Sequence, residues 1–461
     1  MKLDQLNHQK VAIWGYGVEG RASVHYLQRH LPDLKLTVLC PDKEADNGDV
    51  TFNHQTVTAE LLNQFDVVIK SPGISPYQSA VQDSQSKIIS ASALWFSNEL
   101  KRHDKPPTVV AITGTKGKST ASYLLNTALQ AYGLNTVLAG NFGTPLIACE
   151  ADCDVVVLET SSYQAQDGAI QADIAVMLNL YSEHLDWHGD ETTYHRDKWR
   201  LLTESKHALI NAQDNQSRQW QNQSPPKAVT LFNHLSGFYV LDEVLMHQDK
   251  ALLSTAGWPL KGAHNLENLA AVLTVLKVMG LDVKPALNAV KRCPPLPHRL
   301  QSLGVFNGVD VINDSIASTP HATWAALQTV PVERTVLLVG GYERGVDWRW
   351  FAEKIADKPP KLIICSGANG ERISQTLKKH NAIIKLLQVD TLRSAAEKAL
   401  DVTQPGDYVL LSPGAPSFDA FQDYRERGEQ FSQWIQEYET FINYRLVYFY
   451  HLCGGADCKH G

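Results

Sequence analysis

The stretch from Val109 to Thr120, VVAITGTKGKST, constrains the fold of this chain more than any other feature. An apolar run leads into a short loop of glycines, lysines and hydroxyl residues, and a helical pattern follows. Strand, glycine loop and helix in this order are typical of a phosphate-binding loop, in which backbone N–H groups and a helix N-terminus face the phosphates. The residues expected around the phosphates are Gly114, Thr115, Lys116, Gly117, Lys118, Ser119 and Thr120.

This loop departs from the usual GxxxxGK[ST] pattern, because Ile112 stands where the first glycine would be. The loop still has the residues needed to bind phosphate and Mg²⁺. Lys118 adds a cation, and the hydroxyl of Ser119 or Thr120 is suited to bind Mg²⁺. The loop predicts a nucleotide site, and the reaction has to be inferred from the residues near it.

Length and composition narrow the class of protein. At ~100–200 residues per domain, a chain of 461 residues predicts two to four domains. It is 44% hydrophobic and 20% charged, and its net charge of −7 without a basic block makes nucleic acid an unexpected partner. No apolar run approaches the ~18–20 residues of a membrane span, and no signal peptide is evident. Seven scattered cysteines indicate reduced thiols, so we expect a cytoplasmic protein.

Short apolar runs alternate with helical stretches in three successive blocks. Charged and proline-rich segments, KRHDKPP and RCPPLPHR, separate the blocks. Each block therefore predicts a parallel α/β sheet. We expect a Rossmann-like domain at 1–104, a P-loop ATPase-like domain at 105–298, a second Rossmann-like domain at 299–439, and an unassigned tail at 440–461, which is either disordered or loosely docked.

Three further motifs in the central block carry side chains suited to phosphoryl chemistry. Glu159 ends the apolar run VVVLE and offers Mg²⁺ a hard oxygen ligand. His184 follows another run in NLYSEHLDWHG, and Lys198 falls on an expected helix in YHRDKWRL. Taken singly, each has an ordinary explanation as a capping carboxylate, a surface histidine or a solvated lysine. Their combination with the loop indicates a catalytic site.

In order and spacing, these motifs resemble those of the Mur ligases, the ATP-dependent enzymes that add amino acids to peptidoglycan precursors. The resemblance covers about residues 8–436 and rests on GTKGKST, LETSSYQ, NLYSEHLDWHG, YHRDKWR, GAHNLENLAAV, PHR, INDS and LLSPGAPSFDAFQDYRERGEQF. Within the family, GYGVEGRAS, SPGISP and SPGAPSFDAF resemble the members that join glutamate to UDP-N-acetylmuramoyl-L-alanine.

The resemblance implies an ADP-forming acid–amino-acid ligase that works through an acyl phosphate. It implies Lys118, His184 and Lys198 as catalytic residues and two Mg²⁺ ions as cofactors of ATP. Ser119 and Glu159 would hold the first ion, and His184 would hold the second together with Lys198 if that lysine is carbamylated. The expected partners are ATP, UDP-N-acetylmuramoyl-L-alanine and glutamate, and we expect a monomer.

The resemblance also implies contacts for each substrate. For ATP these are Asn265 and Asn268, with Arg299 and Asp314 from the third block, so the third domain is expected to close over the nucleotide. For the UDP substrate they are Gly15, Tyr16, Gly17, Ser71, Pro72, Gly73, Asn141 and His184. For glutamate they are Ser318, Arg344, Ser417 and Tyr424.

Two alternatives from other classes stay open. Gly15, Gly17 and Gly20 form GxGxxG after a strand, with Asp42 after the next strand, which is typical of NAD-dependent oxidoreductases. A hydride-transfer enzyme has no use for the P-loop and its carboxylates, so we interpret the glycines as a cradle for the UDP diphosphate. Uridine contacts near Cys40 and Asp42 depart from the family pattern. A nucleotide-binding protein without ligase activity is disfavoured by the complete set of catalytic residues.

The predicted glutamate pocket departs most from the family. Ile316 stands where D-glutamate enzymes carry a lysine, and Arg344 replaces a second lysine in GGYERGVDW. Glutamate brings two carboxylates that need donors, and arginine offers a bidentate fork in place of a point charge. A branch of the family that adds L-glutamate resembles this chain in NDSIASTP and GGYERGVDW. We favour that branch, with D-glutamate as the alternative.

Overall fold

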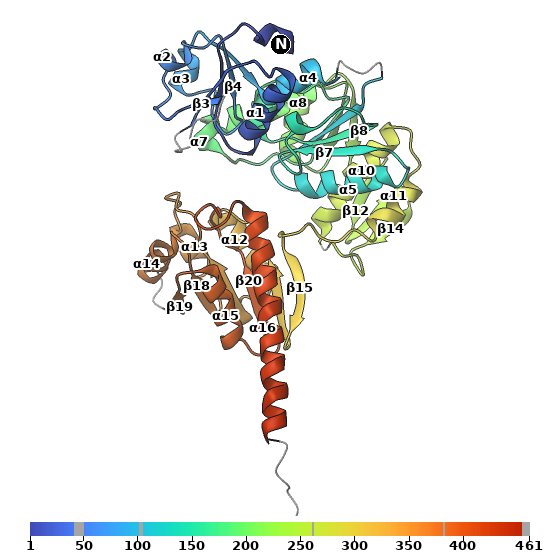
Figure 1. The fold of residues 1–461 in the computed structure, drawn as a ribbon. Coiled ribbons are helices and arrows are strands. Elements are labelled where there is room, and N and C mark those ends of the chain that lie inside the picture. Colours follow the sequence, from blue (N-terminus) through green and yellow to red (C-terminus); the bar gives the residue numbers. More distant parts are fainter. Residues whose placement is uncertain (41–49, 101–104, 261, 381–382, 454–461) are drawn as a thin grey trace, which may run out of the picture. The chain divides into compact units, whose positions relative to one another are not determined.

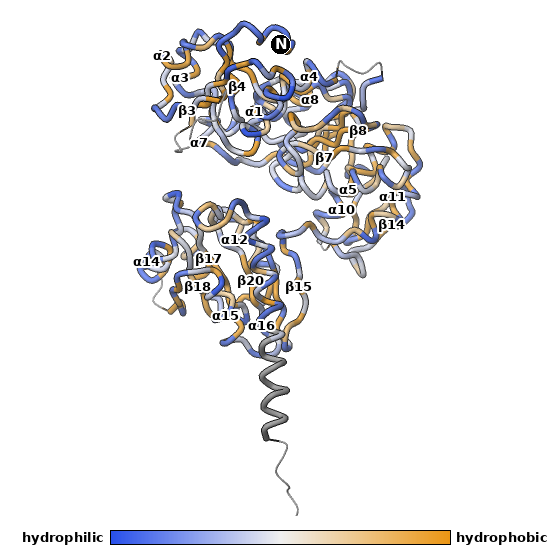
Figure 2. Tube along the Cα trace, in the orientation of Figure 1, coloured by the Kyte–Doolittle hydropathy of each residue, from blue (hydrophilic) through white to orange (hydrophobic). Residues whose placement is uncertain are grey.

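The computed structural model describes residues 1–40, 50–100, 105–260, 262–380 and 383–453 (Figure 1). The chain divides into two compact units, Met1–Pro294 and Pro295–Gly461. Three large α/β sheets follow one another along it, which confirms the predicted fold class. The hydrophobic residues in Figure 2 follow the central strands of these sheets. In the described part of the chain, no helix has the length and apolarity needed to cross a membrane.

The first unit begins with a parallel five-stranded sheet in the order β3-β2-β1-β4-β5. Helices α1 and α4 cover one face of this sheet, and α2 and α3 cover the other. Because both faces are covered, β1 and β4 are buried along their whole length. The elements are η1 (Leu3–Leu6), β1 (Val11–Trp14), α1 (Val18–His30), β2 (Leu36–Leu39), β3 (Val50–Asn53), α2 (Ala59–Leu62), β4 (Val67–Lys70), α3 (Ser79–Gln82), β5 (Lys87–Ser90) and α4 (Ala91–Asn98).

The second sheet has six parallel strands in the order β11-β10-β9-β6-β8-β7, with an antiparallel hairpin sheet β12-β13-β14 beside it. Helices α5, α10 and α11 pack on one face. The elements are β6 (Thr108–Thr113), α5 (Lys118–Gln130), β7 (Thr136–Gly140), η3 (Leu146–Ala148), β8 (Val155–Glu159), α6 (Ser162–Gln166), β9 (Ile174–Met177), α7 (Leu185–His188), α8 (Glu191–Glu204), β10 (His207–Asn211), α9 (Asn215–Gln223), β11 (Val229–Phe232), β12 (Phe238–Leu241), β13 (Val244–His247), β14 (Lys250–Ser254), α10 (Ala263–Val278) and α11 (Val283–Val290).

One hydrophobic cluster joins these first two sheets. It contains Leu27 and Trp95 from the first sheet's helices together with Val109 and Val156 from the second sheet's strands. The indole of Trp95 is fully buried and donates a hydrogen bond of 2.7 Å to the carbonyl of Cys149. The two sheets therefore share a core, which is why they form a single compact unit.

The second unit holds a six-stranded sheet in the order β15-β16-β20-β17-β18-β19, in which only β15 runs antiparallel. Helices α12, α13 and α14 pack on one face, and α15 and α16 pack on the other. The elements are β15 (Gln301–Phe306), β16 (Val309–Asn313), α12 (Pro320–Leu327), η4 (Val332–Arg334), β17 (Thr335–Val339), α13 (Arg349–Lys354), β18 (Leu362–Cys365), α14 (Gly370–His380), β19 (Leu386–Gln388), α15 (Leu392–Val402), β20 (Tyr408–Leu411) and α16 (Tyr424–Cys453).

The structure differs from the sequence prediction at the C-terminal end of the second unit. The segment expected to be a tail from residue 440 onward continues α16 as helix up to Cys453. The predicted boundary between the first two domains falls at residues 101–104, outside the described residues, and stays a prediction.

A buried arginine holds the loops at one end of the third sheet. Arg427 is 2% exposed, and its guanidinium donates to the carbonyls of Ser315, Ala415 and Pro416 and to the Ser315 hydroxyl, over 2.7–3.1 Å. Burial lowers the pKa of Arg427 to about 10, which leaves it charged at neutral pH. This single side chain fixes the loops after β16 and β20 against the start of α16.

We expect Arg427→Met to leave three buried carbonyls without their donor and to destabilise the second unit by about 2–4 kcal/mol. Hydrogen exchange of the amides of β16 and β20 in the full chain measures this loss. Arg393→Met, at an exposed arginine paired with Glu397 and Glu437, is the matched control and should change little, because exposed ion pairs contribute little to stability. Equal protection of both strands in the two variants would show that Arg427 does not hold these loops.

Candidate active site

The phosphate-binding loop lies between β6 and α5, as the sequence predicts. Gly117 caps α5 with φ of 85°, a conformation that favours glycine. A Cβ at Gly117 would lie 2.5 Å from the side-chain oxygen of Asn268, so space as well as backbone angle requires glycine here. Asn268 is therefore packed against the loop from α10, and Asn265 lies in the first turn of the same helix.

Two lysine amines meet at one carbonyl of this loop. Lys118 donates to the carbonyls of Gly114 and Thr115, at 2.9 and 3.0 Å. Lys198, from α8, donates to the same Gly114 carbonyl at 2.9 Å and to the Thr113 hydroxyl at 3.3 Å. Lys198 is 2% exposed, and its pKa lies well below the usual value because of burial and then the charge of Lys118. Burial of this kind favours the uncharged amine of Lys198 over its ammonium form.

Glu159 presents a carboxylate oxygen suited to a cation. It ends β8 and is 1% exposed. One of its oxygens accepts a hydrogen bond of 2.8 Å from the Asn141 amide, and the other is buried with no hydrogen-bond partner in the described structure. Such an oxygen fits a divalent cation, since a buried acceptor without a partner is costly. Ser119, in the first turn of α5, is also buried and supplies a hydroxyl near the loop.

His184 is the N-cap of the single turn α7 and adopts the left-handed conformation, with φ of 56°. Its side chain is half exposed, and its ring lies 5.2 Å from that of Tyr163. Burial lowers the pKa of His184, and the nearby Glu183 opposes this shift. The neighbouring amines of Lys198 and Lys118 also lower the pKa of His184, so the three side chains lie close enough to influence one another. A neutral imidazole is the form that binds a metal.

The described residues contain no group of three His, Cys, Asp or Glu side chains able to hold a metal ion. An ion here would need oxygens from the loop, from a phosphate or from a modified lysine. The donors at hand, Glu159 and the hydroxyl of Ser119, are of the hard oxygen type that Mg²⁺ prefers. The residues therefore fit a magnesium–nucleotide complex better than a metal held by protein alone.

The two loops predicted to hold the UDP diphosphate lie against each other at the edge of the first sheet. The hydroxyl of Ser71 donates to the carbonyl of Gly15 at 3.1 Å, and Gly15 has φ of 93°. Behind them the buried Lys70 donates to the carbonyl of Ile74 at 2.9 Å and lies 3.4 Å from the carboxylate of Asp167. The structure thus brings Gly15, Tyr16 and Gly17 close to Ser71, Pro72 and Gly73. Asp42 lies outside the described residues.

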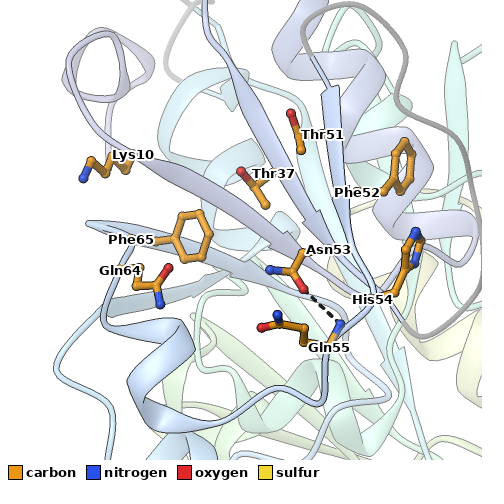
Figure 3. A pocket seen from close by; sticks show the side chains of 9 residues that line it. All are labelled: Lys10, Thr37, Thr51, Phe52, Asn53, His54, Gln55, Gln64 and Phe65. Atoms are coloured by element: carbon orange, nitrogen blue, oxygen red, sulfur yellow. Dashed lines mark hydrogen bonds between the residues drawn. The ribbon is translucent and has the colours of Figure 1, made fainter.

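A cavity of about 750 Å³ lies beside β3 in the same sheet (Figure 3). Phe52, which lines it, also packs edge-on against the ring of Tyr16, with centroids 5.1 Å apart. Asn53 accepts a hydrogen bond of 2.9 Å from the backbone of Gln55, drawn as a dashed line. The lining residues do not include the predicted UDP ligands, and we assign the cavity no ligand. They are Lys10, Thr37, Thr51, Phe52, Asn53, His54, Gln55, Gln64 and Phe65.

In the second unit, Asp314 lies directly after β16 and is 5% exposed. Its oxygens accept from the Leu300 backbone at 3.2 Å and the Ser412 hydroxyl at 2.9 Å. Burial raises the pKa of Asp314 to about 6. Asp314 and Arg299 belong to a different unit from the phosphate-binding loop, so their predicted role in binding ATP stays a proposal.

Arg344 lies on an exposed loop whose shape a second arginine fixes. Arg372, on α14, forms two hydrogen bonds with the carboxylate of Glu343, at 2.7 and 2.8 Å, and one with the carbonyl of Val346, at 2.9 Å. Both flanks of Arg344 are therefore held. Of the other predicted glutamate ligands, Ser417 is buried, Tyr424 is half-buried and Ser318 is exposed.

Sequence reasoning missed several residues that shape the site. Arg427 and Arg372 each reach loops far away in the chain, and only the motif RERGEQF hinted at the first. The sequence did not point to Tyr77 or Asp197. With His188, which lies in NLYSEHLDWHG, they form a hydrogen-bonded chain beside His184 and Lys198 in which His188 and Asp197 are buried. The pairing of Asp197 with Tyr77 spans 120 positions and leaves no local pattern.

The fold and the loop define a P-loop α/β protein with three large sheets. Comparison with known proteins goes further. The family model for the Mur ligase middle domain matches residues 112–276, and that for the Mur ligase, glutamate ligase domain, matches residues 298–414. The chain belongs to the Mur ligase family.

Curated relatives cover nearly the whole chain. A protein of Xanthomonas euvesicatoria pv. vesicatoria named UDP-N-acetylmuramoyl-L-alanine--L-glutamate ligase is 40% identical over 454 residues, 94% of this chain and 96% of that protein. One of the same name from Micromonospora sp. is 31% identical, over 95% and 98% of the two chains. The solved UDP-N-acetylmuramate-alanine ligase MurC of Thermotoga maritima has the same fold, with a TM-score of 0.59 at 16% identity over 93% of this chain and 100% of that chain.

The crowding at Gly117 gives a test of the nucleotide site. Gly117→Ala would place its Cβ against Asn268 and strain the loop, so we expect nucleotide affinity to fall by about tenfold or more, which is about 1.4 kcal/mol. Gly133→Ala is the matched control, because Gly133 also has positive φ, 75°, but has open space around it. Calorimetric titration with Mg²⁺-ADP measures both, and equal affinities would contradict the assignment.

Proposed function

We propose that this protein is an ATP-dependent ligase that joins L-glutamate to UDP-N-acetylmuramoyl-L-alanine in peptidoglycan precursor synthesis. The observation that supports this most is that the buried amine of Lys198, on which the charge of Glu159 acts, donates to the Gly114 carbonyl of the phosphate-binding loop. It occurs in a chain that is 40% identical to relatives named for this reaction.

The proposed chemistry has two steps. The carboxylate of the UDP substrate attacks the γ-phosphorus of ATP, which releases ADP and leaves an acyl phosphate. The amine of glutamate then attacks the acyl carbon, phosphate leaves, and the amine loses a proton as the amide forms. Negative charge builds on phosphoryl oxygens, and Lys118 with the N-terminus of α5 opposes that charge. Closure of the second unit, with Arg299 and Asp314 reaching the nucleotide, would keep water from the acyl phosphate.

Two Mg²⁺ ions would supply further charge neutralisation at the phosphoryl oxygens. We propose that Ser119 and the open oxygen of Glu159 hold the first ion. His184 and a carbamate on Lys198 would hold the second. Carbamylation needs an uncharged amine, whose nitrogen bonds to the carbon of CO₂ and releases a proton. The low pKa of Lys198 supports this modification.

Carbamylation has a direct spectroscopic test. In ¹³C-bicarbonate, we expect the protein to show a carbamate carbon resonance that Lys198→Arg removes. Lys70→Arg is the matched control, since Lys70 is also buried but is paired with Asp167. A resonance that survives Lys198→Arg would place the carbamate elsewhere, and no resonance at all would remove Lys198 from the metal site.

The enantiomer is tested by product formation. With UDP-N-acetylmuramoyl-L-alanine and ATP, we expect mass spectrometry to show ligation of L-glutamate in preference to D-glutamate. We expect Ile316→Lys with Arg344→Lys to lower kcat/KM for L-glutamate by about tenfold or more, because the bidentate fork is lost and a new cation is added. Arg349→Lys, at an exposed arginine near the same loop, is the control. Preference for D-glutamate in the unaltered protein would favour the alternative reaction.

A further inference from the structure

A continuous chain of hydrogen bonds joins the substrate loop of the first sheet to the helices of the second. The hydroxyl of Tyr77 donates to the carboxylate of Asp197, with both oxygens at 2.7–2.8 Å. The Nδ1 atom of His188 lies 2.7 Å from Oδ2 of Asp197, an oxygen that Tyr77 also reaches, and its Nε2 atom lies 3.0 Å from the Ser162 hydroxyl. Asp197, His188 and Ser162 are each 5% exposed or less. The chain is therefore buried over most of its length.

A second set of contacts runs beside this chain. The hydroxyl of Ser75 donates to the carbonyl of Trp187 at 2.7 Å, and the indole of Trp187 donates to the carbonyl of Gly73 at 3.0 Å. The ring of Tyr77 packs edge-on against Trp187, and that of Tyr163 stacks on its other side, with centroids 6.1 and 4.3 Å away. The loop 71–77 and the turn α7 are thus held together through backbone and side chains alike.

The residues at the two ends of α7 link the hydrogen-bonded chain to the proposed metal site. His184 caps the start of this turn and His188 is its last residue, so fixing His188 against Asp197 restricts the orientation of His184. Asp197 directly precedes Lys198 on α8. The residues that hold the loop of Ser71 to Gly73 are therefore one or a few positions from the two proposed ligands of the second cation.

The order Ser162, His188, Asp197 matches that of a serine hydrolase triad, but the surroundings argue against that chemistry. The Ser162 hydroxyl lies on a side chain only 3% exposed, so a substrate carbonyl could not reach it. Tyr77 bonds both oxygens of Asp197 and draws the carboxylate toward the substrate loop. The arrangement is suited to fixing the tautomer and direction of His188.

We propose that Tyr77 and Asp197 are positioning residues that couple occupation of the UDP-substrate loop to the geometry of His184 and Lys198. This inference rests on the proposed function, because it assumes that loop 71–73 holds the UDP substrate. Substrate bound there and the magnesium–nucleotide complex bound at the phosphate loop each favour the same arrangement of α7. Each ligand therefore raises the affinity of the other by the same factor.

The test measures this factor by calorimetry on the full chain. UDP-N-acetylmuramoyl-L-alanine is titrated with and without saturating Mg²⁺ and a non-hydrolysable ATP analogue, and the reciprocal titration must give the same ratio. Couplings of this kind are typically about 5- to 150-fold. We expect Tyr77→Phe to reduce the ratio to about twofold or less while the affinity for each ligand alone changes little, since the lost hydroxyl bonds Asp197. Asp197→Asn should act likewise, because an amide keeps only one of the two oxygen acceptors that Tyr77 contacts and removes the negative charge.

Tyr239→Phe is the matched control, because Tyr239 also donates one hydrogen bond, to the carbonyl of Gln248 on the hairpin sheet. We expect it to keep the full ratio. An unchanged ratio in Tyr77→Phe, or no coupling in the unaltered protein, overturns the inference. Failure of the unaltered protein to bind the UDP substrate at all overturns the proposed function instead.

Discussion

The carbonyl of Gly114, which accepts hydrogen bonds from the amines of both Lys118 and Lys198, is the interaction on which the site depends. Two ammonium groups on one acceptor repel each other, and the buried one loses its proton first. Burial and the neighbouring charge of Lys118 lower the pKa of Lys198, which favours the uncharged, nucleophilic form of this amine on α8. The second oxygen of Glu159, which has no hydrogen-bond partner in the described structure, offers a binding position for a cation in the same site.

The three sheets were predictable because each is built from short apolar runs between turn residues, as in VVVLE and TVLLV. The shared core of the first two sheets was not predictable. It depends on which face of each strand meets which helix, and on long-range contacts such as Trp95 with Cys149. The helical continuation of α16 was missed because the apolar stretch after residue 440 matched no motif.

Within the site, sequence reasoning found the residues that belong to compact motifs, such as Gly117, Lys118 and Glu159. The structure places them together at the loop end of the second sheet, although their chemical roles stay proposals. Residues that act through distant partners were missed, because the pairs Tyr77–Asp197 and Glu343–Arg372 follow no spacing rule. Residues within a short motif can be predicted from the sequence, whereas the residues that hold them in position depend on tertiary packing.

The core shared by the first two sheets has a consequence for modularity. Domains with separate cores can be exchanged independently of one another. Here, replacing the first sheet would expose apolar side chains of the second sheet. It would also leave the carbonyl of Cys149 without its hydrogen bond from Trp95. We therefore expect functional recombinants to be joined near Pro294, at the boundary between the two units, so that the first two sheets stay together. We therefore expect changes in what the first sheet binds to arise in its loops rather than in its strands and helices.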